Sequence, residues 1–84
     1  MKELKVISLE NGVILSENLV KGSILPRTSA ELERDVLIQN DTIVEGAIYA
    51  RKLEIQNGDV EIHDAVFTKL EIQITNNAKA DIIL

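Results

Sequence analysis

Hydrophobic and polar side chains alternate with a period of two along several short stretches of the chain. Leu53 and Ile55 flank Glu54, and residues 70–74 repeat the same alternation. Such alternation predicts β-strands with one buried face. Asn and Gly residues, which supply the backbone conformations that turns need, recur at about one place per group of strands. The pattern therefore predicts an all-β chain of short strands joined by tight corners.

One stretch of strand-like sequence occurs twice. The segment Lys-Leu-Glu-Ile-Gln at 52–56 recurs unchanged seventeen residues later at 69–73, and residues 36–39 are a looser copy one period earlier. A short fixed period of β-forming residues is typical of a solenoid. We therefore predict a short single-stranded β-helix (β-solenoid) of about four rungs with a period of about 17 residues. The expected rungs are 12–35, 36–52, 53–69 and 70–84.

A second set of matches adds an insertion to this scheme. Residues 20–25 match residues 44–49 at an offset of 24, seven more than the period, and residues 44–49 match residues 78–83 at 34, two periods. The extra seven residues fall in 26–35, which contains the only proline and a polar, charged run. Insertions are tolerated where the backbone stays solvated, so we predict a surface excursion there, with a short helical turn near Thr28.

The repeat also predicts which side chains stack along the axis. Gln39, Gln56 and Gln73 are expected to form a ladder of amide hydrogen bonds, as are Asn40 and Asn57. The same alignment places the like charges of residues 54 and 71, and of residues 52 and 69, opposite each other, which is mildly unfavourable.

The rung that contains residues 60–66 fits the repeat less cleanly. Val60 and Glu61 align with Val44 and Glu45, but the stretch that follows, residues 62–66, is one residue longer than the repeat predicts. An extra residue in a strand disrupts the ladder and bends the chain. We therefore predict a bulge or an altered corner in this segment.

Composition supports one β-solenoid domain over residues 1–84, with residues 1–11 as an N-terminal cap or arm. The chain has twelve Ile, seven Val and ten Leu but only two aromatic residues, and β-branched aliphatic side chains pack well on pleated surfaces. With no cysteine, it has neither disulfides nor thiolate metal ligands. A net charge of −5 argues against nucleic acid as a partner. The charged segment Met1–Lys5 and the lack of a long apolar run lead us to expect a cytoplasmic protein.

Candidate chemistry is sparse. His63 is the only histidine, falls where other rungs carry a small residue, and lacks a partner at a recognisable spacing. Asp59, Glu61 and Asp64 do not follow the ligand order of a calcium loop, and the serines and glycines form no nucleophile or phosphate-binding motif. We therefore expect no catalytic, cofactor-binding or metal-binding residues, and a protein that is not an enzyme.

The sequence pattern of residues 44–55 resembles that of the bactofilins, small bacterial cytoskeletal proteins. A Val-x-Gly-x-Ile step, Val44 to Ile48, is followed by a small-x-x-Leu-x-Ile step, Ala50 to Ile55. The resemblance covers residues 36–73 well and residues 12–84 in degenerate form, with His63 and Ala80 in place of the glycine. It implies a right-handed β-helix that polymerises end to end into nucleotide-free filaments, often at a membrane.

Self-association is also expected from the residues alone. The last rung of a β-helix presents unpaired backbone groups over an apolar cross-section, which can template a second chain. In the expected alignment Ile82 and Ile83 take the positions of Ile48 and Tyr49. The residues expected at this interface are Ile72, Ile74, Ile82, Ile83 and Leu84.

Three functions are compatible with the pattern. We expect a homo-oligomer or filament, which needs no cofactor. A protein-interaction module on a β-solenoid scaffold is the alternative, and a fragment of a hexapeptide acyltransferase ranks third because no six-residue repeat is present. A protein partner and a membrane contact stay open.

Overall fold

The computed structural model describes residues 2–4, 7–8, 12–75 and 78–83, with the backbone alone for 7–8 and 78–83. Over these residues the chain forms ten strands and one short 3₁₀ helix. The elements are β1 (Lys2–Leu4), β2 (Ile7–Ser8), β3 (Val13–Ser16), β4 (Asn18–Val20), β5 (Ile24–Leu25), η1 (Ala30–Glu33), β6 (Asp35–Gln39), β7 (Ile43–Val44), β8 (Ile48–Gln56), β9 (Gly58–Ile74) and β10 (Ala78–Ile83).

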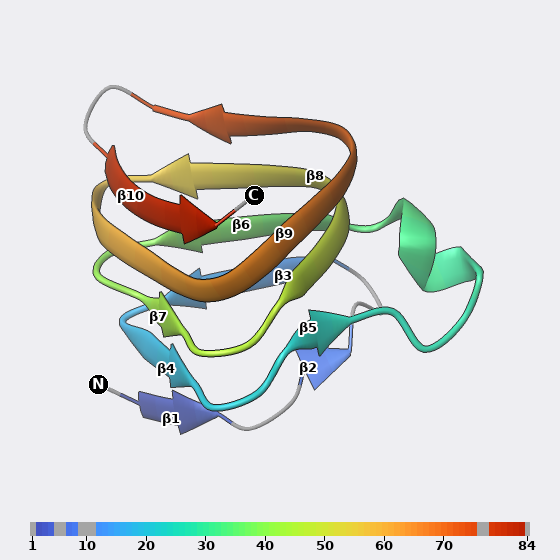
Figure 1. Cartoon of the computed structure of the whole chain (residues 1–84), viewed down its shortest axis with the longest axis horizontal. Helices are drawn as coiled ribbons and strands as arrows, with labels where there is room; N and C mark the ends of the chain where they lie inside the picture. Colours follow the sequence, from blue (N-terminus) through green and yellow to red (C-terminus); the bar gives the residue numbers. More distant parts are fainter. Residues whose placement is uncertain (1, 5–6, 9–11, 76–77, 84) are drawn as a thin grey trace.

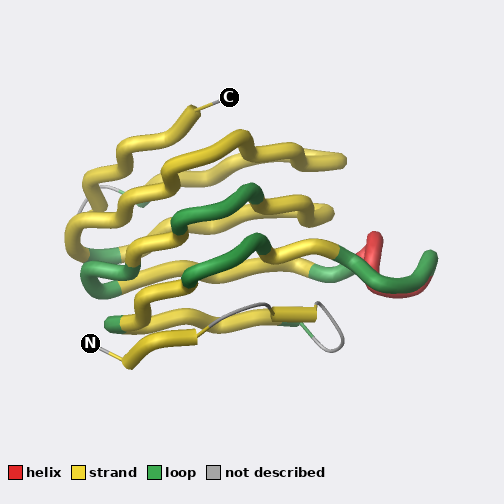
Figure 2. The backbone as a smooth tube through the Cα atoms, turned by 60° about the horizontal axis from the view of Figure 1, so that its bottom comes forward, coloured by secondary structure: helices red, strands yellow, loops and turns green. Residues whose placement is uncertain are grey.

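The strands stack as a β-solenoid of about four turns, which confirms the predicted fold. All strand pairs among the described residues are parallel, and each joins segments about one turn apart in sequence. Figures 1 and 2 show the chain winding upward from β1 to β10 with one turn above another. No helix in the described part of the chain is long and apolar enough to cross a membrane.

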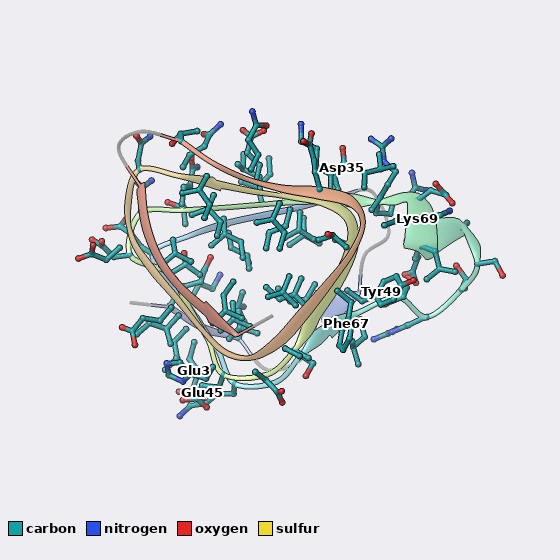
Figure 3. The ribbon with its side chains drawn as sticks, turned by 45° about the horizontal axis from the view of Figure 1, so that its top comes forward. Glu3, Asp35, Glu45, Tyr49, Phe67 and Lys69 are labelled. Atoms are coloured by element: carbon teal, nitrogen blue, oxygen red, sulfur yellow. The ribbon has the colours of Figure 1, made fainter. Side chains whose placement is uncertain are left out.

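Each turn runs along three faces, so that the cross-section is triangular (Figure 3). The β3 face contains β3, β6 and residues 52–56 and 71–74. The β4 face contains β1, β4, β7, residues 58–62 and β10. The β5 face contains β2, β5 and residues 48–50 and 66–68.

The core lies inside the triangle and consists almost entirely of aliphatic side chains. Every second residue of a strand points inward, so vertical columns of Val, Leu and Ile form as the turns stack. The buried hydrophobic residues are Val13, Leu15, Val20, Ile24, Val36, Ile38, Val44, Ile48, Ala50, Leu53, Ile55, Val60, Ile62 and Val66. Thr42 is also fully buried, and its Oγ1 donates to the Gln39 carbonyl at 2.7 Å, which satisfies its polar group.

The corner between the β3 and β4 faces repeats one backbone conformation. Glu17, Asn40 and Asn57 have φ values of 53°, 54° and 46°. The N–H of Glu17 donates to the Asn40 carbonyl at 3.0 Å, and the N–H of Asn40 donates to the Asn57 carbonyl at 2.7 Å. Asn tolerates this left-handed region better than most residues do, so the sequence indicated the corners at Asn40 and Asn57. Glu17 carries no such signal.

The excursion leaves the solenoid between the β5 and β3 faces (Figures 1 and 2). Val20 pairs with Val44 and Ile24 with Ile48, so the offset of 24 is confirmed. The predicted helical turn is η1, where Thr28 Oγ1 accepts a hydrogen bond from the N–H of Glu31 at 3.4 Å. An ion pair from Glu33 to Lys69 ties the excursion to a later turn.

The seventeen-residue register holds between β6 and β8 but not beyond. Val36 pairs with Leu53, as predicted, whereas Leu53 pairs with Ile72 at an offset of 19. The predicted match of residues 52–56 with 69–73, and with it the boundary between the last two rungs, is therefore wrong by two residues. Even-numbered slips keep the same side chains inward, so the identical pentapeptides also fit the wrong register.

The stacks predicted from that register change accordingly. Gln39 pairs with Gln56 as expected, but Gln73 pairs with Glu54 and does not continue the ladder. The predicted facing of Glu54 and Glu71, and of Lys52 and Lys69, is also wrong, because Lys52 pairs with Glu71.

The first part of β9 is also shifted by two residues from its predicted register. Val44 pairs with Ile62, so the predicted alignment of Val60 with Val44 is wrong by two residues. The predicted irregularity is confirmed where β10 pairs with β9: Ile82 pairs with Ile62 and the next residue, Ile83, pairs with Ala65. Between these two pairs, β9 therefore contains two residues that have no counterpart in β10.

Candidate self-association surface

The end of the solenoid after the last turn presents three strand edges. These edges belong to residues 66–68 on the β5 face, 71–74 on the β3 face and β10 on the β4 face. Among the described residues, no strand pairs with the outer side of any of the three. Their N–H and C=O groups therefore point away from the molecule in the direction in which a further parallel strand would stack.

Two of the five predicted interface residues, Ile72 and Ile74, lie at this end. Ile72 pairs with Leu53 and Ile74 with Ile55, so both continue core columns. Ile55 is fully buried, whereas Ile74 is 49% exposed and Ile72 is only partly buried against the core. The difference indicates that the last turn of the described core is not covered as the earlier turns are.

Ile82 and Ile83 lie in β10, but in different columns from those predicted. Ile82 pairs with Ile62 and so continues the column of Val44, not that of Ile48. The cause is the offset of 20 residues between paired positions of β9 and β10, which is longer than the uniform period of 17 residues used in the prediction. The structure describes only the backbone of these two residues, and Leu84 lies outside the described residues.

The opposite end presents a matching set of edges. β1 pairs with β4 and β2 with β5, both in parallel and at offsets of 16 and 17 residues. The N-terminal segment therefore stacks as a further partial turn, with Leu4 packed against the core. Residues 5–6 and 9–11 of the predicted cap or arm lie outside the described residues.

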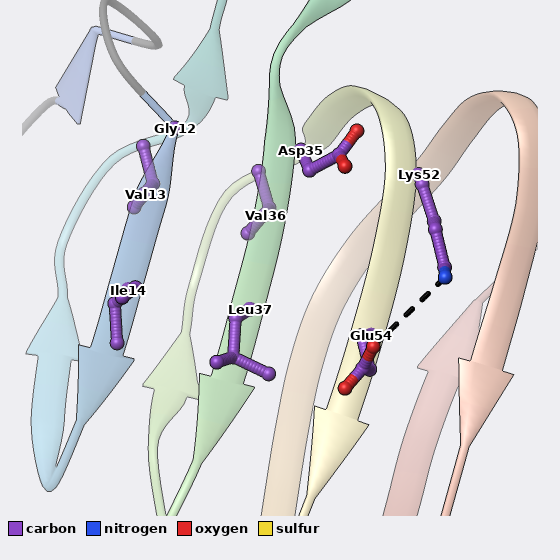
Figure 4. A pocket seen from close by; sticks show the side chains of 8 residues that line it. All are labelled: Gly12, Val13, Ile14, Asp35, Val36, Leu37, Lys52 and Glu54. Carbon is purple, nitrogen blue, oxygen red and sulfur yellow. Dashed lines mark ion pairs between the residues drawn. The ribbon is translucent and has the colours of Figure 1, made fainter.

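The β3 face carries a shallow hollow of about 300 Å³ on its outer surface (Figure 4). Ile14, which is 70% exposed, and Leu37 form its apolar part, and Lys52 and Glu54 form a charged side with an ion pair at 4.0 Å. Gly12, whose φ of 86° favours glycine, also lines the hollow.

Asp35 borders the same hollow and is held by Arg51. The guanidinium donates two hydrogen bonds of 2.8 Å to the two carboxylate oxygens. Since these bonds favour the ionised form, they lower the pKa of Asp35 below its ordinary value, with the positive charges of Arg51 and Lys52 acting in the same direction. The pair joins the end of the excursion to the corner of the next turn.

The β5 face carries a short apolar ladder on its outer surface. Tyr49 pairs with Phe67, and their rings stack with centroids 6.4 Å apart. Leu25 lies one position after Ile24, the partner of Ile48, and is 46% exposed, while Phe67 is 55% exposed. This ladder was not predicted from the sequence, although a signal was available: the only two aromatic residues, Tyr49 and Phe67, are 18 positions apart.

His63 lies on the corner after residues 58–62 and is exposed. Its Nε2 is 3.2 Å from Glu61 Oε1. The register places it beside Glu45 and not beside Gly46 as predicted, because Val44 pairs with Ile62. Within the described residues, no three His, Asp or Glu side chains gather in a way that could hold a metal ion.

Comparisons of the chain with protein-family models, with curated proteins and with solved structures gave no match. The arrangement of strand edges, exposed core residues and outer surfaces is therefore the basis for assigning a function.

Proposed function

We propose that this chain is a structural, bactofilin-like protein of the cytoplasm that self-assembles through the ends of its β-solenoid. The observation that carries the proposal is the exposure of Ile74. Ile74 stacks on Ile55 in the same core column, but it is half-exposed whereas Ile55 is fully buried. A second chain stacked on this end would bury it, and burying an aliphatic side chain fully is worth about 1.5–3 kcal/mol.

The strand edges support the same proposal. A stacked chain would give hydrogen-bond partners to residues 66–68, residues 71–74 and β10 on three faces at once. Open strand edges of this kind are templates for pairing with other chains. The inward positions whose side chains the structure describes at this end, on the β5 and β3 faces, carry no charge: they are Val66, Thr68, Ile72 and Ile74.

Sedimentation velocity over a wide range of protein concentration tests the proposal. The wild-type chain is expected to form species larger than the monomer as its concentration rises. Ile74→Lys would place an unpaired charge in the buried interface and is expected to shift the distribution to the monomer. Ile14→Lys, on the outer surface, is the matched control and is expected to leave assembly unchanged. A wild-type chain that stays monomeric at high micromolar concentration would refute self-assembly.

A second candidate function is the docking of a partner protein on the β3 face. It is favoured by the hollow in which the exposed Ile14 lies beside Leu37, since apolar surface rimmed by charged residues is a feature of interaction sites. If Ile14→Lys, and not Ile74→Lys, abolishes the association seen by sedimentation, the contact surface is the β3 face and not the end of the solenoid.

A further inference from the structure

Two columns of side chains run along the solenoid where the β5 face meets the β3 face. The first is the apolar ladder described above, which consists of Leu25, Tyr49 and Phe67. The second, which we call the basic column, consists of Arg34, Arg51 and Lys69 in three successive turns. Arg51 and Lys69 each follow a ring of the ladder by two positions, and the N–H of Arg51 donates to the Arg34 carbonyl at 2.9 Å. Apolar and basic side chains are therefore neighbours over the same turns.

Contacts within the chain show that the basic column binds carboxylates. Asp35 accepts two hydrogen bonds of 2.8 Å from Arg51, one on each carboxylate oxygen. Glu33 in η1 forms an ion pair with Lys69. Both carboxylates belong to the excursion, and charge-assisted bonds of the two-pronged kind seen at Arg51 are among the stronger hydrogen bonds in proteins. A carboxylate is therefore an anion that fits the geometry of this column.

Two guanidinium groups at this corner are left over. None of the ion pairs among the described residues involves Arg27 or Arg34. The Nε of Arg34 is buried and has no hydrogen-bond partner in the described part of the chain, and a buried donor of this kind costs free energy that a bound acceptor recovers.

The local charge at this corner differs in sign from that of the whole chain. The cations here are Arg27, Arg34, Arg51 and Lys69, and the carboxylates are Glu31, Glu33 and Asp35. Glu31 is buried and accepts a hydrogen bond from the N–H of Arg27 at 3.0 Å. The corner is thus positive by one charge, whereas the chain carries −5. Its charge complements an acidic partner.

From these two columns we infer that the β5 face and the excursion bind a segment of another protein in which acidic and apolar residues alternate. Successive side chains of an extended segment point to opposite sides. A segment lying along the solenoid axis between the columns places its apolar side chains on the ladder and its carboxylates beside the guanidinium groups. Three turns span about 10 Å, which corresponds to three or four residues of extended chain.

The shape of this surface favours a narrow segment over a flat membrane. The excursion stands out from the solenoid (Figures 1 and 2), and η1 packs against β8, the strand that contains Tyr49. Figure 3 shows Tyr49 and Phe67 outside the triangle on the side next to the excursion. A planar bilayer would meet the excursion first, where Thr28 and Ser29 are exposed and polar. A single extended chain fits beside it.

Tyr49 gives a direct readout of binding, because it is the only tyrosine and the chain has no tryptophan. The full chain is titrated with the blocked peptide Glu-Leu-Glu-Phe-Glu while tyrosine fluorescence is recorded, and a saturable change is expected. Lys-Leu-Lys-Phe-Lys reverses the charge of this probe, and Glu-Ser-Glu-Ser-Glu removes its apolar side chains. We expect each control peptide to bind at least tenfold more weakly.

Substitutions in the chain locate the binding. Phe67→Ala shortens the ladder and Arg27→Glu reverses an exposed charge, and each is expected to weaken binding of Glu-Leu-Glu-Phe-Glu at least fivefold. Lys2→Glu makes the same change of charge on the β4 face and is expected to leave binding unchanged. Circular dichroism checks that each variant is folded. Arg27→Gln replaces Arg27→Glu if the latter alters the spectrum.

The outcomes decide the inference without reference to self-assembly, because the surface lies on the side of the solenoid and not at an end. Absence of binding at millimolar peptide, equal binding of the acidic and basic peptides, or binding that is insensitive to both Phe67→Ala and Arg27→Glu would overturn it. Vesicles of phosphatidylcholine and phosphatidylglycerol are tested in parallel. A tyrosine response to the vesicles and not to the peptide would assign this surface to a lipid membrane and refute the protein partner.

Discussion

Lys52 lies opposite Glu71 on the β3 face, with its Nζ 3.6 Å from Glu71 Oε1. The repeated pentapeptide would have placed Lys52 opposite Lys69. The observed register replaces a repulsive contact between like charges with an attractive one, and it leaves the same side chains in the core.

This register can be tested with engineered disulfides. Lys52→Cys/Glu71→Cys is expected to form an intramolecular disulfide readily, because paired residues of neighbouring strands have Cα atoms about 4.8 Å apart. Lys52→Cys/Lys69→Cys is the matched control and is expected to oxidise poorly. Mass spectrometry of the oxidised monomers gives the yield of each bond. Preferential disulfide formation between positions 52 and 69 would contradict the observed register and support the seventeen-residue register.

Removal of the excursion is expected to leave the solenoid intact. Deleting residues 27–33 joins Pro26 to Arg34 and leaves three residues between Ile24 and Asp35. Their partners in the next turn, Ile48 and Lys52, are likewise separated by three residues. Circular dichroism should stay β-rich and thermal unfolding should stay cooperative. Some stability should be lost with the Glu33–Lys69 ion pair, typically under about 1 kcal/mol for a surface pair.

A broad, non-cooperative unfolding transition in the shortened chain would show that the excursion covers the core. The separate contribution of the ion pair can be measured with Glu33→Gln in the full-length chain. This variant removes the charge and retains the excursion.

The corner at Glu17 offers a stabilising substitution. Its φ of 53° is costly for a residue with a Cβ atom, by about 1–2 kcal/mol relative to glycine. Glu17→Gly is therefore expected to raise the free energy of unfolding by about 0.5–1 kcal/mol, since part of the gain is offset by the greater freedom of glycine in the unfolded chain. Glu17→Ala keeps the Cβ atom and should show no such gain. Equal effects of the two substitutions in urea unfolding would contradict this explanation.

Gly46 is required by close contact between neighbouring turns. A Cβ atom at this position would lie 2.2 Å from Ser23 Oγ and 2.5 Å from the Gly22 carbonyl oxygen. Gly46→Ala is expected to lower the free energy of unfolding by about 1–3 kcal/mol. Adding Ser23→Ala should recover only part of this loss, because the backbone contact stays and the hydrogen bond that the Ala47 N–H donates to Ser23 Oγ disappears. Full recovery in the double variant would show that the backbone contact is unimportant.

The pair of Asp35 and Arg51 predicts a dependence on pH. The pKa of Asp35 is lowered in the folded chain, so its contribution is present above the unfolded pKa of about 3.9 and is lost as the pH falls through the lower folded value. Asp35→Asn should therefore cost less than about 1 kcal/mol near neutral pH, because the pair is largely exposed. The two proteins should become equally stable in strong acid. A cost that stays constant at low pH, measured by urea unfolding, would mean that the charge of Asp35 is not responsible.

The sequence predicted the solenoid, its excursion and the corners at Asn40 and Asn57, because each carries a local signal. Alternation and turn residues report burial and backbone conformation directly. The register of β9 could not be predicted in the same way. Slips of two residues preserve the inward positions, so the difference between Leu70 and Ile72 as the partner of Leu53 depends on where the chain absorbs extra residues.

The candidate interface was predicted in part. Ile72 and Ile74 belong to core columns at one end, as expected, because strand alternation fixes their face. The column of Ile82 was missed, because it depends on the longer spacing between β9 and β10. The position of β1 and β2 as a partial turn has no clear signal in their short sequences.

The parallel stack also determines how the chain should respond to force. Among the described strands, each turn pairs with the turns directly before and after it, so pulling on the two ends should peel the molecule apart one turn at a time. Each released turn of 16 to 24 residues would lengthen the chain by about 5–8 nm. A filament built from such units would yield under tension by unwinding in small steps, and each step could reverse when the load falls.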